Sequence, residues 1–367
     1  MPSDIPKSRR LTLRDVAEHA GVSMMTVSRV LNSQPRVSPK TRARVESAIR
    51  ALDFKPNGAA RALAAGARPT SGSAFEPAPK IAFVFDSPNT VFLGEMVSNG
   101  FDEATLANVQ LVFVKTRAED DPSHTARSVL SLGVTGVILA PPLSDDARLR
   151  LILAEAGLRI VAIGCCDEDP AISTIGIDDT RAAYEMTRYL IQLGHRRIGF
   201  ILGHPRHRSS ARRRAGYEAA LRAHGIEPDQ RLQWEGRYNF GSAISAAEQA
   251  LSVQPPITAL FASNDDMAAA AISVARARGI NVPRGLSVCG FDDSEIALMI
   301  FPQLTTVRLP IAEMVRHGVR QLATELYALR HDQPLKIKKL SLEHQIAFRD
   351  SDAPPDTLDS ATSYPQG

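Results

Sequence analysis

Cysteine is scarce in this chain. Only Cys165, Cys166 and Cys289 occur among its 367 residues. Their number is odd and two of them are adjacent, which fits neither a disulfide framework nor the spacing of metal ligands. We therefore expect a protein of the reducing cytoplasm that has no metal and no other cofactor.

Long apolar segments are also missing. The longest apolar run, Met267 to Ala275, is far shorter than the roughly 20 residues of a membrane-spanning helix. The N-terminus has basic residues but no apolar stretch after them, which argues against a secretory signal. With 44% hydrophobic and 23% charged residues, the composition is that of a soluble protein with two or three domains.

Several catalytic signatures are absent as well. There is no G-x-G-x-x-G after the first predicted strand, and no G-x-x-x-x-G-K-[ST], G-x-S-x-G or H-E-x-x-H. Doubly wound sheets often belong to dehydrogenases or phosphotransferases, so an enzyme is the strongest alternative function. The missing motifs argue against it, and we expect a protein that is not an enzyme.

Positive charge is concentrated at the N-terminal end. Residues 1–68 contain 13 Lys and Arg against 5 Asp and Glu, a net charge of +8, and the remaining residues have a net charge of −5. A solvated basic tail would lack large aliphatic residues, but this segment has many, among them Val16, Val22, Val27, Val30, Leu31, Val45, Ile49 and Leu52. A small folded domain with a polyanion as its partner fits better.

Start and stop signals predict three short helices in this basic segment. The first runs from Leu13 to Ala20, and Gly21 permits the turn that follows. Ser23 can cap a second helix, Met24 to about Leu31, and Ser38 can cap a third. Two helices joined by a tight turn and backed by a third form a helix-turn-helix.

The segments TLRDVAEHAGVSMMTVSRVLN and VSPKTRARVESAIRALDFKPNGAARALA closely resemble the DNA-binding end of the lac/gal repressor (LacI/GalR) family. The resemblance implies that the second helix enters the major groove, where Arg29 can form paired bonds to guanine. Met24 and Met25 would contact thymine methyl groups, or would only cover neighbouring side chains. Thr26, Ser28 and Asn32 match positions that contact phosphates in the family. Thr12, which can cap the first helix, is also expected to contact DNA.

A separate short helix is predicted over residues 57–66, with Asn57 as its N-cap and Gly66 as its stop. By the same resemblance it is a hinge helix that orders on the operator. Leu63 falls where the family inserts a leucine between central base pairs, and Asn57, Ala60 and Arg61 complete the motif. The alternative is a plain linker helix.

Beyond a Pro-, Ser- and Gly-rich linker, apolar runs alternate with amphipathic segments. One series runs from Ile81 to Gly164, and a second begins at Ser173–Ile177 and ends at Leu286–Gly290. This alternation predicts parallel sheets with helices on both faces, arranged as two lobes. The expected organisation is a helix-turn-helix domain (1–56), a hinge helix (57–66), a linker (67–79), a two-lobed α/β domain (80–350) and a disordered tail (351–367).

The resemblance extends into the α/β domain through LGHRRIGFI, RRAGYEAAL, ASNDDMAAAA, VCGFDD and LTTVRLP. It implies the two-lobed fold of periplasmic sugar-binding proteins, with a ligand in the cleft. By analogy, the chain would cross between lobes near Gly164, Asp293 and Arg320.

Effector-binding residues are carried over by the same comparison. Arg213 and Asp265 match two effector-holding positions, Tyr238 matches a pocket aromatic, and Asp292 and Phe92 are weaker candidates. A guanidinium and a carboxylate facing one cleft suit a hydroxyl-rich ligand. A structural salt bridge is the alternative for the first pair, and core packing for Phe92.

A group of basic residues surrounds Arg213 in the sequence. Its members are His204, Arg206, His207, Arg208, Arg212 and Arg214. They indicate either an anionic effector or, as charge runs usually do, a solvated surface.

These observations predict a sequence-specific transcription regulator controlled by a sugar or sugar derivative. The resemblance implies a repressor, as most members of the family are, whereas the residues themselves leave an activator as the alternative. Its partners would be pseudo-palindromic double-stranded operator DNA, the effector and a second copy of the chain, with no membrane. The C-terminal tail has no leucine heptad, so we expect a dimer without a tetramer-forming helix. A sugar-binding receptor is the remaining alternative, and the DNA-binding head argues against it.

Overall fold

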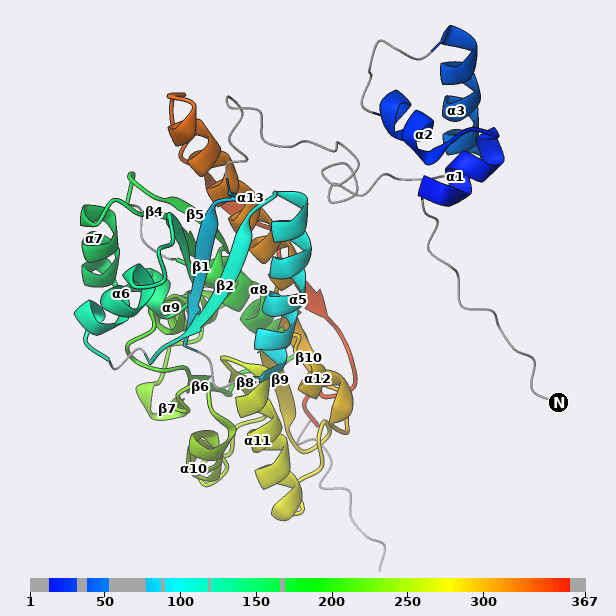
Figure 1. Ribbon diagram of the computed structural model, residues 1–367. Helices are drawn as coiled ribbons and strands as arrows, with labels where there is room; N and C mark the ends of the chain where they lie inside the picture. Colours follow the sequence, from blue (N-terminus) through cyan, green and yellow to red (C-terminus); the bar gives the residue numbers. More distant parts are fainter. Residues whose placement is uncertain are drawn as a thin grey trace, which may run out of the picture. The chain divides into compact units, whose positions relative to one another are not determined.

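The computed structural model describes residues 13–31, 38–52, 77–86, 90–117, 120–165 and 169–356. The chain divides into two compact units, Met1–Pro77 and Ala78–Gly367 (Figure 1). The predicted hinge helix, 57–66, and most of the predicted linker lie outside the described residues.

The first unit contains the three predicted helices. They are α1 (Leu13–Ala20), α2 (Met24–Leu31) and α3 (Pro39–Ala51). The Ser23 hydroxyl accepts a bond from the Thr26 amide at 3.2 Å, and Ser38 caps α3 in the same way. Both predicted serine caps are therefore confirmed.

A small apolar core holds these helices together. Its buried members come from all three helices: Val16, Ala17, Ala20, Val27, Val30, Val45 and Ala48. Gly21 adopts φ +60°, which a residue with a Cβ rarely does, and this lets α1 turn sharply into α2. The Arg44 guanidinium then donates to the carbonyls of Ala20 and Gly21 at 2.6 and 3.1 Å, which ties the turn to α3.

The second unit contains two six-stranded sheets. The sheet of the first lobe has the order β11-β5-β4-β3-β1-β2, and all its strands are parallel. Strand β1 alternates strictly: Ile81, Phe83 and Phe85 face α5 and α13, whereas Ala82 and Val84 face α6 and α7 (Figure 1). The first lobe comprises β1 (Lys80–Phe85), α5 (Thr90–Leu106), β2 (Gln110–Lys115), α6 (Pro122–Leu130), β3 (Gly136–Leu139), α7 (Ala147–Glu155), β4 (Arg159–Ile163), β5 (Ser173–Ile177), α13 (Ile311–Arg330) and β11 (Lys339–Leu342).

The sheet of the second lobe has the order β12-β10-β9-β8-β6-β7, in which only β12 is antiparallel to its neighbour. Helices α8 and α9 pack on one face, and α10 and α11 pack on the other. The second lobe comprises α8 (Asp179–Gln192), β6 (Ile198–Leu202), α9 (Arg208–Ala223), β7 (Gln233–Glu235), α10 (Phe240–Ala250), β8 (Ala259–Ala262), α11 (Asp265–Ala277), β9 (Ser287–Asp292), α12 (Glu295–Met299), β10 (Thr305–Arg308) and β12 (Gln345–Ala347).

The chain crosses between the lobes at positions other than those expected. Strand β5 pairs with β4, so the first crossing follows Ile177 and not Gly164. Strand β10 still belongs to the second sheet, which places the next crossing between Arg308 and α13 rather than at Asp293. The third lies between β11 and β12, because α13 packs on the first sheet throughout.

The expectation of a disordered tail from residue 351 onward is wrong for its first residues. The Ser351 side chain is fully buried, and its hydroxyl donates to the Val288 carbonyl at 2.6 Å. The Ala353 carbonyl accepts a bond from His195, so this part of the chain is fixed by hydrogen bonds to the second lobe.

None of the helices in the described ranges combines the length and apolar character that crossing a bilayer requires. In the same part of the chain, no three His, Cys, Asp or Glu side chains gather as a metal site would need.

Candidate functional site

Helix α2 is the first candidate site. Met24 is 55% exposed, whereas Val27 and Val30 are buried against α1 and α3, so the helix has a solvent-facing side. Thr26 is half-buried and bonded to Ser23. Met25, Ser28 and Arg29 belong to α2, but their side chains are not among the described ones. The remaining predicted DNA contacts lie outside the described residues: Thr12, Asn32, Asn57, Ala60, Arg61 and Leu63.

A cavity between the two lobes of the second unit is the second candidate site. Its volume is about 160 Å³, and strand ends of both sheets line it. Asp86 follows β1, Gly164 follows β4, Asn264 follows β8 and Asp292 ends β9. Because parallel strands present their carboxyl ends at one edge, residues far apart in sequence meet here.

Arg213 of α9 is the central charged group of this cavity. It is 7% exposed, and its Nε donates to Asp179 at 2.8 Å. Its Nη1 donates to the Ser263 carbonyl at 2.5 Å and to Asp292 at 3.4 Å. The guanidinium carbon lies 3.6 Å from the centre of the Phe291 ring. Burial opposes the charge, but Tyr238, Asp179 and Asp292 raise the Arg213 pKa above its ordinary value, so the side chain stays cationic.

Asp292 combines an unusual backbone with an unusual carboxyl group. Its φ is 113°, outside the conformations that side chains other than glycine usually adopt. Burial, opposed by the charge of Arg213, raises the Asp292 pKa to about 7. The carboxyl group can therefore donate or accept a hydrogen bond near neutral pH.

Tyr238 forms an aromatic wall of the cavity. Its hydroxyl lies 3.2 Å from the Ser209 hydroxyl, and its ring centre is 5.7 Å from the Arg213 guanidinium carbon. The ring packs directly on Gly203, where an added Cβ would come within 2.1 Å of Tyr238. Gly203 is therefore required for this position of the ring.

His207 precedes α9 and lies beside Tyr238, with ring centres 5.3 Å apart. Burial, together with the charges of His204, Arg213 and Arg206, lowers the His207 pKa to about 4. The imidazole is neutral at physiological pH and can both donate and accept a hydrogen bond.

Asp265 does not line this cavity, contrary to the expectation that it faces the cleft. It is 1% exposed, and its carboxylate accepts bonds from the Thr306 hydroxyl at 2.5 Å and the Ser294 amide at 2.7 Å. These bonds connect α11 to β10 and to the loop after β9. Burial and the charge of Asp292 raise its pKa well above the ordinary value.

Of the other predicted effector residues, Phe92 lies in the first turn of α5, and its side chain is not among the described ones. Sequence reasoning missed Asp179, the closest ionic partner of Arg213, and it also missed Ser209, whereas His207 was expected only as a member of the basic group around Arg213. The carboxylates directly after the strand at 173–177 were the available signal for Asp179.

Two family models match the chain. Residues 12–57 match the bacterial regulatory proteins of the lacI family, and residues 187–351 match a periplasmic binding protein-like domain. The first match corresponds to the helix-turn-helix. The second covers most of the second lobe together with α13 and β11 of the first lobe, and it includes Arg213, Tyr238 and Asp292 of the cavity.

Individual relatives match nearly the whole chain. The HTH-type transcriptional regulator DegA of Bacillus subtilis (strain 168) is 32% identical over 351 residues, which are 95% of this chain and 100% of the relative. Among solved structures, the complex of the transcriptional regulator CelR with cellobiose has a TM-score of 0.68 at 30% identity, covering 93% of this chain and 100% of CelR. The lac repressor dimer bound to operator and the anti-inducer ONPF has a TM-score of 0.66 at 26% identity, covering 94% of this chain and 99% of the repressor.

Proposed function

Because the chain belongs to the lacI family of bacterial regulatory proteins, we propose that it represses transcription under the control of a polyhydroxy effector bound in the Arg213 cavity. Its relatives are DNA-binding transcription regulators rather than enzymes. The effector is a sugar or sugar derivative. The observation that carries this proposal is the fixed polar network around Arg213.

The cavity chemistry supports a hydroxyl-rich ligand. Arg213 uses Nε and Nη1 for its bonds to the protein, and no described residue accepts a bond from Nη2. That nitrogen can donate to a ligand oxygen, while Asp292 and Asn264 supply further polar atoms. The Tyr238 ring offers an apolar face for the C–H surface of a sugar ring. CelR, which shares this fold, was solved with cellobiose.

Control of DNA binding follows from a ligand that contacts both lobes. Asp86 belongs to the first lobe, and Arg213 and Asp292 belong to the second. A ligand that bridges these groups binds best to one arrangement of the lobes and shifts the population toward it. Operator affinity changes only if the two arrangements of the lobes also differ in their affinity for DNA. The effector then changes operator affinity by the same factor by which the operator changes effector affinity.

The basic N-terminal domain is the DNA-binding part of the proposal. Operator affinity should fall steeply with salt, and a chain that begins at Lys80 should not bind the operator. Arg29→Ala should lose about 1 to 3 kcal/mol of discrimination per half-site.

Leu63→Ala should reduce operator bending, because an apolar wedge helps to kink DNA. Equal bending by the parent and the Leu63 variant in a circular-permutation gel would contradict the hinge assignment.

A homodimer is the expected form on a pseudo-palindromic operator. Exposed apolar side chains occur on α5, at Phe101 and Leu106, and around α12, at Leu298, Met299 and Phe301. Large exposed apolar groups of this kind mark association surfaces. The similar lac repressor was solved as a dimer on its operator.

The decisive experiment couples two readouts. A thermal-shift screen of sugars, sugar acids and nucleobases identifies the effector, since a ligand that binds only the folded protein raises its melting temperature. An operator identified by selection from random DNA is then titrated with and without that effector. A ligand that binds but leaves operator affinity unchanged would contradict the proposed control.

A further inference from the structure

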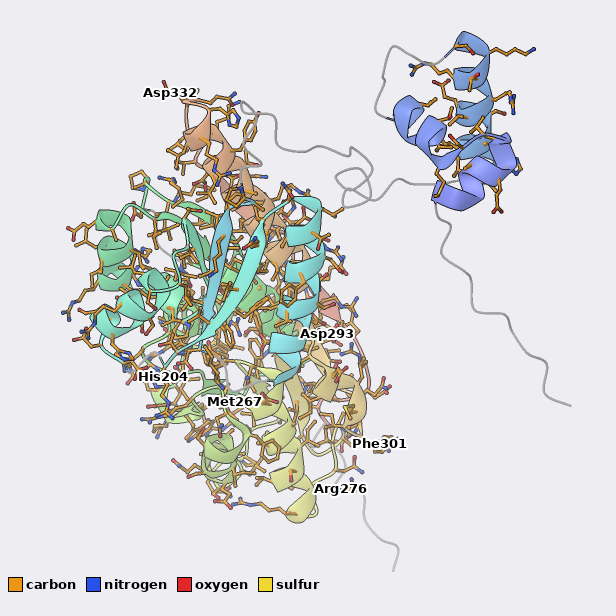
Figure 2. All side chains as sticks on the ribbon, in the orientation of Figure 1. His204, Met267, Arg276, Asp293, Phe301 and Asp332 are labelled. Atoms are coloured by element: carbon orange, nitrogen blue, oxygen red, sulfur yellow. The ribbon has the colours of Figure 1, made fainter. Side chains whose placement is uncertain are left out.

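The mouth of the effector cavity carries an excess of positive charge. A wider cleft of about 540 Å³ shares Asp86, His207 and Tyr238 with the Arg213 cavity, so the two spaces adjoin. His204 lies at this mouth, between the two lobes (Figure 2). The fully charged residues that line it are five cations, Lys115, Arg117, Arg206, Arg208 and Arg237, and three carboxylates, Asp86, Asp145 and Asp146.

Several of these charges already have local partners. The Arg237 guanidinium bonds to Glu235 at 2.5 Å, and Asp146 accepts from the Leu149 amide at 3.0 Å as the N-cap of α7. Lys115 and Arg117, at and after the end of β2, are exposed and form no ion pair within the described ranges. At least two cationic side chains of the cleft, Lys115 and Arg117, can therefore turn toward a ligand.

The start of α9 adds to the same field. This helix runs for 16 residues from Arg208, and His207 at its N-cap position makes no capping bond through its side chain to any described residue. The first backbone N–H groups of a helix have no partner within it, and its dipole places partial positive charge there. Arg206 and Arg208 flank this end of the helix, so their side chains and the helix N-terminus carry charge of the same sign, which attracts an anion.

The inner cavity has the opposite balance. Arg213 lies against two carboxylates, Asp179 at 2.8 Å and Asp292 at 3.4 Å. An anion placed there would face both carboxylates, whereas neutral hydroxyl groups can bond to every member of the network. One ligand that fills both spaces would thus be neutral and hydroxyl-rich inside, and negatively charged at the mouth.

We infer that the effector is a carbohydrate carrying an anionic group, a carboxylate or a phosphate, which binds at the mouth among Lys115, Arg117 and the start of α9. The inference deepens the proposed function and rests on it for the identity of the inner site. The anion site does not depend on the proposed function, because it can be tested with inorganic phosphate alone.

The first test measures thermal unfolding of the full chain in inorganic phosphate and in chloride at equal ionic strength. The test variant is Lys115→Gln/Arg117→Gln, and the matched control is Arg284→Gln/Lys336→Gln, which removes the same charge from exposed positions that do not line the cleft. Phosphate should raise the melting temperature of the parent and the control more than chloride does, and the test variant should lose most of that gain. No gain in the parent, or an equal gain in all three proteins, would overturn the inference.

The second test compares matched ligand pairs by calorimetry: glucose with glucose 6-phosphate, glucose with glucuronate, and galactose with galacturonate. An anionic member should bind at least about tenfold more tightly than its neutral partner, and the Lys115→Gln/Arg117→Gln variant should lose that preference. The pairs also distinguish a carboxylate from a phosphate. Equal affinity within the pairs that bind would overturn the inference and leave a neutral sugar as the effector. If no pair member binds, the phosphate result alone decides.

Failure of the proposed function gives a different pattern. A chain with no preferred DNA sequence would contradict the regulator proposal, whatever phosphate does to its stability. A chain that binds an operator and releases it with a neutral sugar would support that proposal and contradict only the anionic effector.

Discussion

Arg213 lies between two carboxylates and two aromatic rings, and each neighbour restricts it differently. Asp179 and Asp292 fix the direction of the guanidinium through hydrogen bonds, and Phe291 supports its face. A planar group with several donors suits this position, whereas an ammonium group provides the same charge without the fixed fork.

We therefore predict that Arg213→Lys weakens effector binding by about 2 kcal/mol, because charge-assisted bonds to the ligand lose their geometry. Operator binding without effector should remain near that of the parent, since the substitution lies in the other unit. Arg222→Lys, on the exposed side of the same helix, is the control. Calorimetry with the screened effector is the measurement, and unchanged affinity in the Arg213 variant would place the pocket elsewhere.

Asp292 leads to a prediction about pH. Its pKa is about 7 in the folded chain and near 3.8 when unfolded, so the folded state holds an extra proton between these values. The stability from this proton is fully present below about pH 4 and is lost as pH rises through about 7. Asparagine does not titrate, so in Asp292→Asn the free energy of unfolding should fall less steeply as pH rises.

The measurement is urea unfolding of parent and Asp292→Asn from about pH 5 to about pH 8, with the difference in free energy of unfolding plotted against pH. The parent should lose stability relative to the variant as pH rises, by about 1.4 kcal/mol per pH unit for each proton released. Asp265, whose pKa is raised by burial and by the Asp292 charge, contributes to the same loss. His207, whose pKa is lowered to about 4, contributes with the opposite sign in both proteins and cancels in the difference. A difference independent of pH would contradict the raised pKa.

At the scale of elements, the end of β6 and the loop after β7 must approach closely, because the Tyr238 ring packs on Gly203. Gly203→Ala should displace the ring, lower the free energy of unfolding by about 1 to 3 kcal/mol and weaken effector binding. Gly94→Ala is the control: its Cβ would meet nothing within 4 Å, and alanine favours a helix interior by up to about 1 kcal/mol. A Gly203 variant with parental stability and effector affinity would show that the ring moves without cost.

A segment near the end of the described residues, Arg349–Ala353, acts as a strap across the second lobe. Arg349 donates to the Leu304 carbonyl at 2.6 Å, and the Ser351 hydroxyl accepts from the Thr305 amide at 2.8 Å. A chain that ends at Arg349 should lose about 3 kcal/mol or more, since buried groups on β9 and β10 lose their partners. A chain that ends at Asp356 keeps every described contact and is the control. Equal melting temperatures of the two truncated chains would contradict the structural role of the strap.

For the whole molecule, the prediction concerns association. Met299→Glu places a charge on the exposed apolar surface around α12 and should shift the chain toward the monomer by at least about tenfold in dissociation constant. Operator affinity should fall with it, because each half-site then binds one domain alone. Leu151→Glu, an exposed apolar position on α7, is the matched control. Sedimentation equilibrium and operator titration check both expectations, and a Met299 variant that remains dimeric would move the interface to another surface.

The sequence alone was enough for the features that depend on near neighbours in the chain. The helices of the first unit begin where Ser23 and Ser38 can cap them, and the apolar run that begins at Ile81 forms a buried strand, β1. The short elements β7 and α10 were not predicted, because their local patterns are weak.

Tertiary structure decided the features that depend on distant partners. Ser173–Ile177 joined the first sheet and not the second, because a strand's neighbour is chosen by long-range pairing and not by its own pattern. Asp265, which follows a strand as ligand-binding residues do, turned instead to Thr306 and Ser294, and Asp179 became the partner of Arg213. Capping and periodicity act over one or two turns of chain, whereas the direction of a buried charge depends on which groups the whole fold brings within hydrogen-bonding distance.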